Sequence, residues 1–328
     1  MVMKYRKADA KAYARQHMTG IWAAAMTPFA RDLSVDWEAY QRNMRHWVDD
    51  LKIDGLFISG KQGEFASMSL AERKRSFELA VETIGDRAGT IPSCSDQNID
   101  TVIELAKHAQ AVGAEYVVVH APVLYFQTAQ DQTLYEYYRY IAEQVDIGIA
   151  MWSHPDSGYL MSPELCARIA TDIPNIVAIK YSVPREMYVK LTHLAGDKLI
   201  VSTSSEEEWF DNIVELNWRL YLCSSPPYLI QTKHDLRMRE YTDLAFKGEV
   251  ARARAVRDSL DPVRKAMAST RPPEKPQAHQ KYWQELLGQA GGPTRRPQPN
   301  LTEAEKVATK AAFATCGLKL NQPAQAAE

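Results

Sequence analysis

The sequence predicts an α/β protein, a (β/α)8 barrel with a C-terminal helical extension. Eight short apolar runs recur along the chain, and most of them are rich in β-branched residues and apolar on both faces. Such runs are typical of parallel strands that are buried on both sides. Amphipathic helical segments alternate with them, and this alternation is typical of a barrel. A doubly wound sheet is the alternative, but it usually has fewer strands in a chain of this length.

The expected elements follow one another from residue 20 onward. Ser69 opens a capping box with Glu72, and Ser162 followed by Pro163 gives an N-cap and a proline at the first helical position. Beyond about residue 248 the strands stop and helical segments follow, over residues 249–269, 278–290 and 302–317. We therefore expect an N-terminal arm over residues 1–19, the barrel over 20–247 and a helical region over 248–328. The expected strands cover residues 20–26, 55–60, 89–95, 115–121, 147–153, 175–182, 198–204 and 219–225.

Composition and charge restrict the class of protein. The 328 residues are 45% hydrophobic, which is enough for a large core. Lysine and arginine number 39 and aspartate and glutamate 41, so the charge balance predicts neither a nucleic acid nor a membrane surface as partner. No apolar run approaches the roughly 18 residues of a membrane span. The four cysteines lie far apart without a CxxC pair, which favours reduced thiols in a cytoplasmic protein.

The stretch "GLFISGKQGE", residues 55–64, nearly spells a phosphate-binding loop. Residues 56–59 are strand-like, however, and Gln62 occupies the position of the magnesium-binding hydroxyl, so the nucleotide interpretation is weak. In a barrel, residues 60–64 instead form the loop after the second strand, on the face where active sites lie. Gly60 and Gly63 permit a tight turn there, whose backbone N–H groups can hold a carboxylate.

A lysine on the sixth expected strand carries the sharpest chemical signal. In "NIVAIKYSVP", Val177, Ile179 and Tyr181 are expected to face the surrounding helices. Lys180 then points into the barrel near its C-terminal end. A desolvated lysine favours the neutral amine, which can attack a ketone and form a Schiff base. A lysine that reaches solvent along its own stem is the alternative, and the spacing alone leaves both open.

At this point the chain resembles the dihydrodipicolinate synthase / N-acetylneuraminate lyase family of class I, pyruvate-type aldolases. The resemblance implies a (β/α)8 barrel with three C-terminal helices, a homotetramer built as a dimer of dimers, and no cofactor. Lys180 matches the lysine that forms a Schiff base with the keto group of pyruvate or another 2-keto acid. The loop at residues 60–64 matches the family's carboxylate-binding loop, with Lys61, Gln62 and Gly63 as candidate ligands. The residues that carry the resemblance are 24–29, 54–73, 120–126, 151–155 and 175–182.

The sequence departs from the family at two places that matter for chemistry. Lys61 and Gln62 replace the loop hydroxyls that bind the carboxylate and relay protons. Lys61 is expected to pair with the carboxylate, or to be an exposed loop lysine. The family's relay tyrosine lies 28 positions before the lysine, where this chain has Trp152, and an indole has no proton to transfer in the useful range. Candidates for a moved relay are Tyr125, His154 and Ser153, of which His154 has the most suitable intrinsic pKa.

Further details favour one branch of the family. The arginine that binds a distal carboxylate in dihydrodipicolinate synthases would fall at Ser157, which argues against a role in lysine biosynthesis. Tyr181 and "CSSPPY", residues 223–228, are similar to the hydratase-aldolase branch, which cleaves aryl-substituted unsaturated 2-keto acids. Trp152, Tyr125 and Phe126 would suit a flat aromatic substrate by stacking, unless they pack a subunit interface.

We therefore expect a Schiff-base lyase, an aldolase or hydratase-aldolase, that acts on a small 2-keto acid. Ser202, Thr203 and Ser204 after the seventh strand are expected to hold substrate oxygens. A dehydratase of a 2-keto-3-deoxy sugar acid would use the same lysine, and a barrel that kept its fold but lost catalysis would be a binding protein. Residues 206–208 are three glutamates, which we interpret as first-turn acids of a helix and not as a magnesium site.

Overall fold

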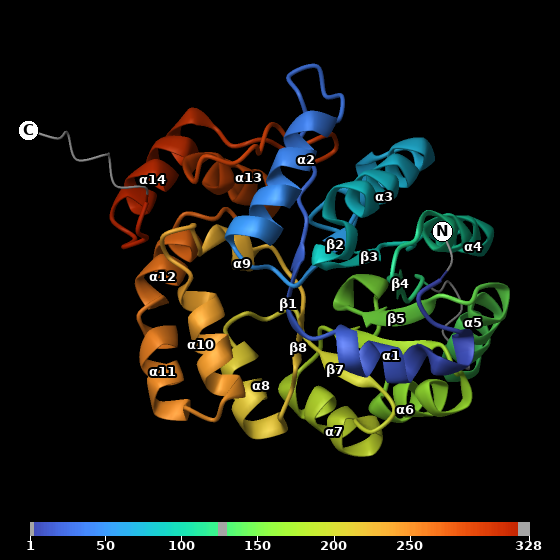
Figure 1. The fold of residues 1–328 in the computed structure, drawn as a ribbon. Coiled ribbons are helices and arrows are strands. Elements are labelled where there is room, and N and C mark those ends of the chain that lie inside the picture. The colour runs from blue at the N-terminus through green and yellow to red at the C-terminus, as the bar shows by residue number, and fades with distance from the viewer. Residues whose placement is uncertain (1–2, 124–129, 321–328) are drawn as a thin grey trace, which may run out of the picture.

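The computed structural model describes residues 3–123 and 130–320 and confirms the barrel. Eight parallel strands occur in the described residues, each inside a range expected from the sequence (Figure 1). Their bounds are β1 Gly20–Ala24, β2 Gly55–Ile58, β3 Gly89–Pro92, β4 Tyr116–His120, β5 Gly148–Ser153, β6 Ile176–Tyr181, β7 Ile200–Ser202 and β8 Leu220–Leu222.

The strands form two four-stranded halves that close on each other at two seams. One half has the order β3-β2-β1-β8 and the other β4-β5-β6-β7. At the first seam, Ser93 bridges in parallel to Val118. At the second seam a side chain replaces the missing ladder: Ser202 Oγ donates to the Leu220 carbonyl at 2.8 Å and accepts from the Leu222 N–H at 2.8 Å. Ser202 is therefore used in closing the barrel.

Two of the helices between the strands begin where the sequence signals predicted. Both bonds of the capping box form at Ser69, and the Ser162 hydroxyl accepts from the Leu165 N–H. The helices that surround the barrel are α2 Trp37–Arg45, α3 Leu70–Ile84, α4 Ile99–Val112, α5 Gln130–Gln144, α6 Pro163–Asp172, α7 Arg185–Ala195, α8 Trp209–Leu216 and α10 Arg237–Phe246, with the short α9 Pro226–Leu229 before α10.

The N-terminal arm contains a helix, α1 Ala10–His17, which covers the N-terminal end of the barrel. Ala10 and Ala14 are fully buried in the cluster that fills the barrel interior. Val177 belongs to the same cluster, so the expectation that it faces the outer helices was wrong. The reason is a register irregularity between β5 and β6, where Ile149 pairs with Ile176 and Ala150 pairs with Ala178, which leaves Val177 unpaired and turned inward.

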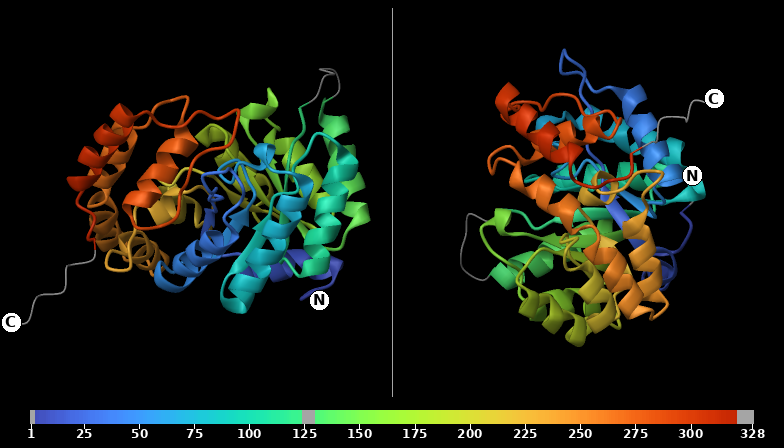
Figure 2. Two further views of the ribbon diagram at one scale, coloured as in Figure 1. Left: turned by 90° about the horizontal axis from the view of Figure 1, so that it is seen from above. Right: turned by 90° about the vertical axis from the view of Figure 1, so that its left-hand side faces the viewer.

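Four helices follow residue 248 in the described part of the chain, where the resemblance implied three. The segment expected to be helical over 249–269 divides at Ser259–Leu260, because Pro262 cannot donate to a continuing helical ladder and instead sits in a new first turn. These helices pack together on one side of the barrel (Figures 1 and 2). They are α11 Val250–Asp258, α12 Asp261–Ser269, α13 Pro276–Leu286 and α14 Glu303–Ala314. Within the described ranges, no helix is long and apolar enough to span a membrane.

Candidate active site

A cavity of about 680 Å³ opens at the carboxyl ends of the strands. Its barrel wall includes Lys61 and Gln62 after β2, Trp152 on β5 and Lys180 on β6. Its other wall comes from the C-terminal region, between α12 and the start of α13. Ligand sites of barrels lie at this end because the strand-to-helix loops gather there. Four positions predicted separately from the sequence thus lie around one cavity.

Lys180 is almost fully enclosed, with 2% of its surface exposed. Its Nζ lies 4.3 Å from the centre of the Trp152 ring and 5.1 Å from that of Phe57. Burial lowers the pKa of the Lys180 amine, and the positive charge of Lys61 adds to the effect. The structure thus gives Lys180 the environment that favours a neutral, nucleophilic amine, and not the solvent-reaching alternative.

The strand register explains why Trp152 lies beside the lysine. His120 on β4 pairs with Trp152 on β5, and Trp152 pairs with Lys180 on β6. The His120 ring meets the Trp152 ring edge-on at 4.6 Å between centroids. The Trp152 Nε1–H is buried and has no hydrogen-bond partner in the described residues. A buried donor is usually satisfied, so this N–H is available to an oxygen of a bound ligand.

The loop after β2 has unused polar groups, and its Lys61 and Gln62 line the cavity, whereas the predicted ligand Gly63 does not. No hydrogen bond of the described residues uses the backbone N–H groups of Lys61, Gln62 or Gly63, and the buried Gln62 Oε1 is also unpartnered. Lys61 forms an ion pair with Asp156, which follows β5. Burial opposes ionisation of Asp156, but Lys61 and His154 outweigh it and hold the pKa of that carboxyl below its usual value. In this structure Lys61 is therefore already neutralised by a carboxylate.

Glycine at positions 60 and 63 is required by close approach. A Cβ at Gly60 would lie 2.2 Å from the Phe57 ring, and one at Gly63 would lie 3.0 Å from the Ala25 carbonyl. The left-handed backbone expected of a tight turn occurs instead at the neighbouring Ser59 and Glu64, with φ of 51° and 57°.

The loop is held from behind by the C-terminal region. Glu64 is 1% exposed, and its carboxylate lies 2.5 Å from Nζ of Lys281 on α13. The backbone N–H of Arg295 donates to the same carboxylate at 2.9 Å. Glu64 therefore caps an N–H group, as a structural glutamate would, but the group belongs to a segment 231 positions away in the chain.

His154 lines the cavity with Lys180. Its Nδ1 accepts from the Asp156 N–H at 3.1 Å, so the neutral ring carries its hydrogen on Nε2. Burial lowers the pKa of His154, partly opposed by the carboxylate of Asp156. Of the two members of the predicted relay set that the structure describes, His154 reaches the cavity and Ser153 does not. Tyr125 and Phe126 lie outside the described residues.

The remaining predicted serine and threonine residues differ in whether their side chains face the cavity. Ser153 faces outward, and its Oγ accepts from the Met161 N–H at 3.1 Å. Ser202 closes the barrel, as described above, and Thr203 is buried without lining the cavity. Ser204 does line the cavity and shares a hydrogen bond of 3.0 Å with Ser182. Of these four residues, Ser204 is the one that lines the cavity with Lys180, whereas Ser202 pairs with Lys180 in the register of β6 and β7 without reaching the cavity.

The three consecutive glutamates differ from the expectation of first-turn acids. Helix α8 begins only at Trp209, and Glu206 is buried, with Arg264 donating to both of its oxygens at 2.8 Å. Tyr241 also donates to Glu206, at 2.7 Å. Glu206 is therefore oriented towards Arg264 on α12, because a buried carboxylate needs a charged partner. Among the described residues, no group of three or more His, Cys, Asp or Glu side chains could hold a metal ion.

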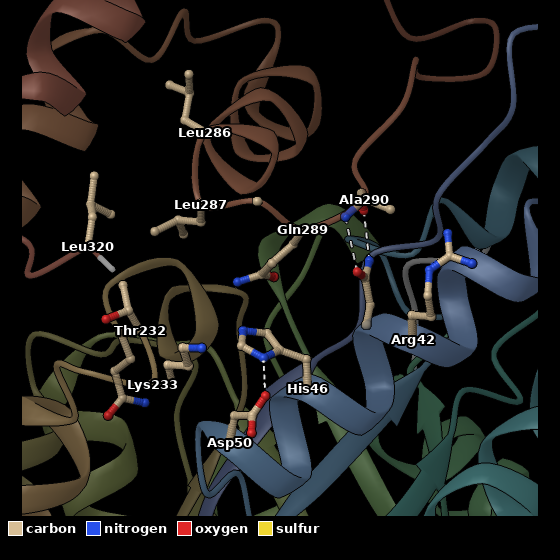
Figure 3. Close-up of a pocket in the computed structure, with 13 residues that line it drawn as sticks. Arg42, His46, Asp50, Thr232, Lys233, Leu286, Leu287, Gln289, Ala290 and Leu320 are labelled. Carbon is tan, nitrogen blue, oxygen red and sulfur yellow. Dashed lines mark hydrogen bonds and ion pairs between the residues drawn. The ribbon is translucent and has the colours of Figure 1, made fainter. Parts of the chain in front are cut away.

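A second cavity, of about 740 Å³, lies between α2 and the end of α13 (Figure 3). Several of its polar side chains already have partners. His46 bonds to Asp50 at 2.7 Å, and Asn43 exchanges hydrogen bonds with the backbone of Ala290. The described residues of its lining include no buried nucleophile, so we assign the reactive chemistry to the cavity of Lys180.

Sequence reasoning missed two residues beside the site. His120 is the last residue of β4 and occupies an inward position, two residues after Val118 and four after Tyr116. The alternation of inward and outward residues along a strand could have identified it from the sequence. Burial lowers the pKa of His120 to about 4, so its imidazole is neutral at pH 7. Lys281 had no such signal, because its partner Glu64 is distant in sequence.

Fold and site together define a (β/α)8-barrel protein with a desolvated lysine beneath an open cavity at the strand ends. The chain belongs to the dihydrodipicolinate synthetase family, whose model matches residues 17–315. It is 27% identical over 262 residues to a 4-hydroxy-tetrahydrodipicolinate synthase of Thermotoga petrophila, covering 77% of this chain and 85% of that protein. It is 32% identical over 179 residues to an uncharacterized DapA-like lyase of Pyrococcus horikoshii, covering 55% and 59%. These names place the chain in a family of lyases.

Solved structures agree with the fold. A prophage protein of the dihydrodipicolinic acid synthase family from E. coli K12, solved in complex with pyruvate, superimposes with a TM-score of 0.80 at 22% identity. The match covers 91% of this chain and 98% of that one. At this identity the likeness shows the barrel and its extension, and carries no statement about substrate.

Proposed function

We propose that the protein is a class I lyase that forms a Schiff base between Lys180 and the keto group of a 2-keto acid. The observation that carries the proposal is the burial of Lys180, which lowers the pKa of its amine within a cavity large enough for a ligand. Membership of a family of lyases supports the same conclusion. We expect the substrate carboxylate to bind the free N–H groups of the loop at residues 61–63 and the buried Trp152 N–H.

The proposed reaction conserves atoms and charge in four steps. The neutral amine of Lys180 adds to the keto carbon, and uptake of one proton with loss of water gives a protonated imine. In a 4-hydroxy-2-keto acid, loss of the hydroxyl proton breaks the C3–C4 bond and its electron pair moves to the iminium, which gives an enamine and releases an aldehyde. Protonation of the enamine at C3 regenerates the protonated imine, and addition of water then releases pyruvate and one proton and restores the neutral lysine. We propose His154 as the group that accepts the hydroxyl proton, because it lines the cavity where the family's tyrosine is replaced by Trp152. The proton goes to Nδ1, the ring nitrogen without a hydrogen, in place of the bond from the Asp156 N–H, and the Asp156 carboxylate 3.2 Å away then pairs with the charged ring.

Elimination of water is the second candidate reaction, because the same imine allows loss of a hydroxyl group from a 2-keto-3-deoxy sugar acid. The described cavity wall supports a polar substrate, since it includes Ser204, Ser205 and Ser224. This wall gives the aryl preference of the hydratase-aldolases little support. Product analysis separates the reactions: cleavage yields pyruvate and an aldehyde, whereas elimination yields one dehydrated keto acid.

Borohydride trapping tests the proposal. The protein is incubated with pyruvate, reduced, digested and searched for added mass. Two lysines line the cavity, and Lys61 serves as an internal control because its side chain is 42% exposed and ion-paired with Asp156. The proposal requires the adduct on Lys180, absent in Lys180→Met. An adduct on Lys61 instead, or none with several 2-keto acids and folded protein, would overturn it.

A further inference from the structure

The C-terminal region supplies part of the wall around Lys180, although no step of the proposed reaction uses it. Arg271, Pro273, Gln277 and Gln280 line the same cavity as the lysine. They lie in the connection from α12 to α13 and in the first turn and a half of α13. Prolines restrict this connection and begin α13, so the wall has little conformational freedom. A rigid wall beside a reactive lysine is suited to recognition of a ligand.

The cavity is larger than the reacting part of a substrate requires. Pyruvate has six non-hydrogen atoms, which occupy about 180 Å³ if each takes the ~30 Å³ share of one water molecule in the liquid. The cavity holds about 680 Å³. Most of its volume is therefore available to the part of a ligand that lies beyond the keto acid group.

Two amide side chains in this wall lack partners. Gln277 is 9% exposed and Gln280 is 8% exposed, and neither side chain has a hydrogen bond to any described residue. Neither amide is among the buried polar atoms of the described residues without a partner, so both amide groups reach the open cavity that they line and are available to a ligand there. Among the described residues, no side chain caps the N-terminus of α13, and its first turn contains no acidic residue.

The surrounding charges indicate what the amides bind. Arg271 and Glu207 both line the cavity and both are exposed, so their opposite charges give no net preference for a second anionic group. An amide offers both a donor and an acceptor, which matches a hydroxyl group. Apart from Trp152 and His154, the lining from described residues contains no aromatic ring on which an aryl group could stack.

We propose that Gln277 and Gln280 form a distal subsite, which binds hydroxyl groups on the part of a 2-keto acid farthest from its keto carbon. The inference rests on the proposed function, since it places the keto carbon at Lys180. It assigns the C-terminal helices a direct part in substrate choice.

The test compares three keto acids by the concentration that half-saturates borohydride trapping on Lys180, counting intact and cleaved adducts. Pyruvate has no distal part, 2-oxohexanoate has an apolar one, and 2-keto-3-deoxygluconate has a hydroxylated one. The variant is Gln277→Leu/Gln280→Leu, which retains size and helix propensity. The control is Gln132→Leu, the same change on the exposed face of α5.

Wild-type protein and the control should half-saturate with the hydroxylated acid at a concentration about 10-fold below that for 2-oxohexanoate. The double variant should lose this preference, while its half-saturation with pyruvate stays unchanged. Equal half-saturation of the two six-carbon acids in wild-type protein, or an unaltered preference in the variant, would overturn the subsite even if pyruvate is trapped. If pyruvate is not trapped, the proposed function fails. The subsite is then judged by thermal stabilisation, which the hydroxylated acid must give to wild-type protein and not to the variant.

Discussion

The ion pair between Lys281 and Glu64 is one of the contacts through which the C-terminal region positions the loop of the active site. Both side chains are about 1% exposed, and the Lys281 Nζ also donates to the Pro293 carbonyl at 2.9 Å. Burial lowers the pKa of Lys281, and Glu64 opposes that shift. Lys281→Met keeps the length of the side chain but leaves the Glu64 carboxylate buried, with the Arg295 N–H as its remaining partner.

Removing one partner of a buried pair costs about 3–5 kcal/mol, because the other charge is left uncompensated. At ~2.1 cal/mol/K per residue, the 328 residues give an unfolding entropy near 0.7 kcal/mol/K, so the expected fall in Tm is about 4–7 °C. The double variant Lys281→Met/Glu64→Gln should recover most of the loss, because the amide that replaces the Glu64 carboxylate can still accept from the Arg295 N–H without a buried charge.

Urea unfolding followed by tryptophan fluorescence and by circular dichroism measures the loss, provided that the two transitions coincide. A loss below about 1 kcal/mol in Lys281→Met, or a double variant whose loss equals the sum of the single losses, would refute the reasoning. Because Glu64 directly follows Gly63, Lys281→Met should also raise the half-saturating concentration of pyruvate in the trapping assay.

Three further outcomes are expected. Lys180→Met should raise the free energy of unfolding at pH 7 by about 0.5–2 kcal/mol. Because the pKa of Lys180 is lower in the folded protein, the free energy of unfolding of the wild type rises with pH up to the pKa of the unfolded chain near 10.5. A Lys180→Met variant that is less stable than the wild type in urea would contradict the expected gain. Folding lowers the pKa of His120 to about 4, so its contribution to the free energy of unfolding is fully present above pH 6.5, and about 3 kcal/mol of it is lost as the pH falls towards 4. His120→Asn should therefore flatten the dependence of the free energy of unfolding on pH in this range, as measured by urea titration. An unchanged slope in the variant would count against this reasoning. Asp156→Asn should free Lys61 and lower the half-saturating concentration of pyruvate in the trapping assay about 2–5-fold. The free energy of unfolding should change little, because both side chains are partly exposed. A higher half-saturating concentration would show that the ion pair is needed to hold the loop.

Local patterns in the sequence determined the strand positions and the direction of the lysine. The strands could be predicted because burial on both faces requires continuous apolar runs. The starts of two helices could be predicted because capping involves residues within one turn of each other. The inward position of Lys180 follows from the period of two along β6, downstream of the irregularity that turned Val177 inward. That irregularity had no local signal, because it depends on the pairing of β6 with β5.

Only the tertiary structure decided which polar groups around the lysine are already used. Ser202 was predicted as a ligand but bonds across the seam between β7 and β8, and Lys61 is neutralised by Asp156 from another loop. The pairing of Glu64 with Lys281, and the arrival of Gln277 beside Lys180, join residues that are separated by about 100 to 200 positions in the chain. Hydrogen bonding and charge pairing act over a few ångströms of space, so the partner of a polar side chain is set by which distant segments the packed barrel and its C-terminal helices bring together.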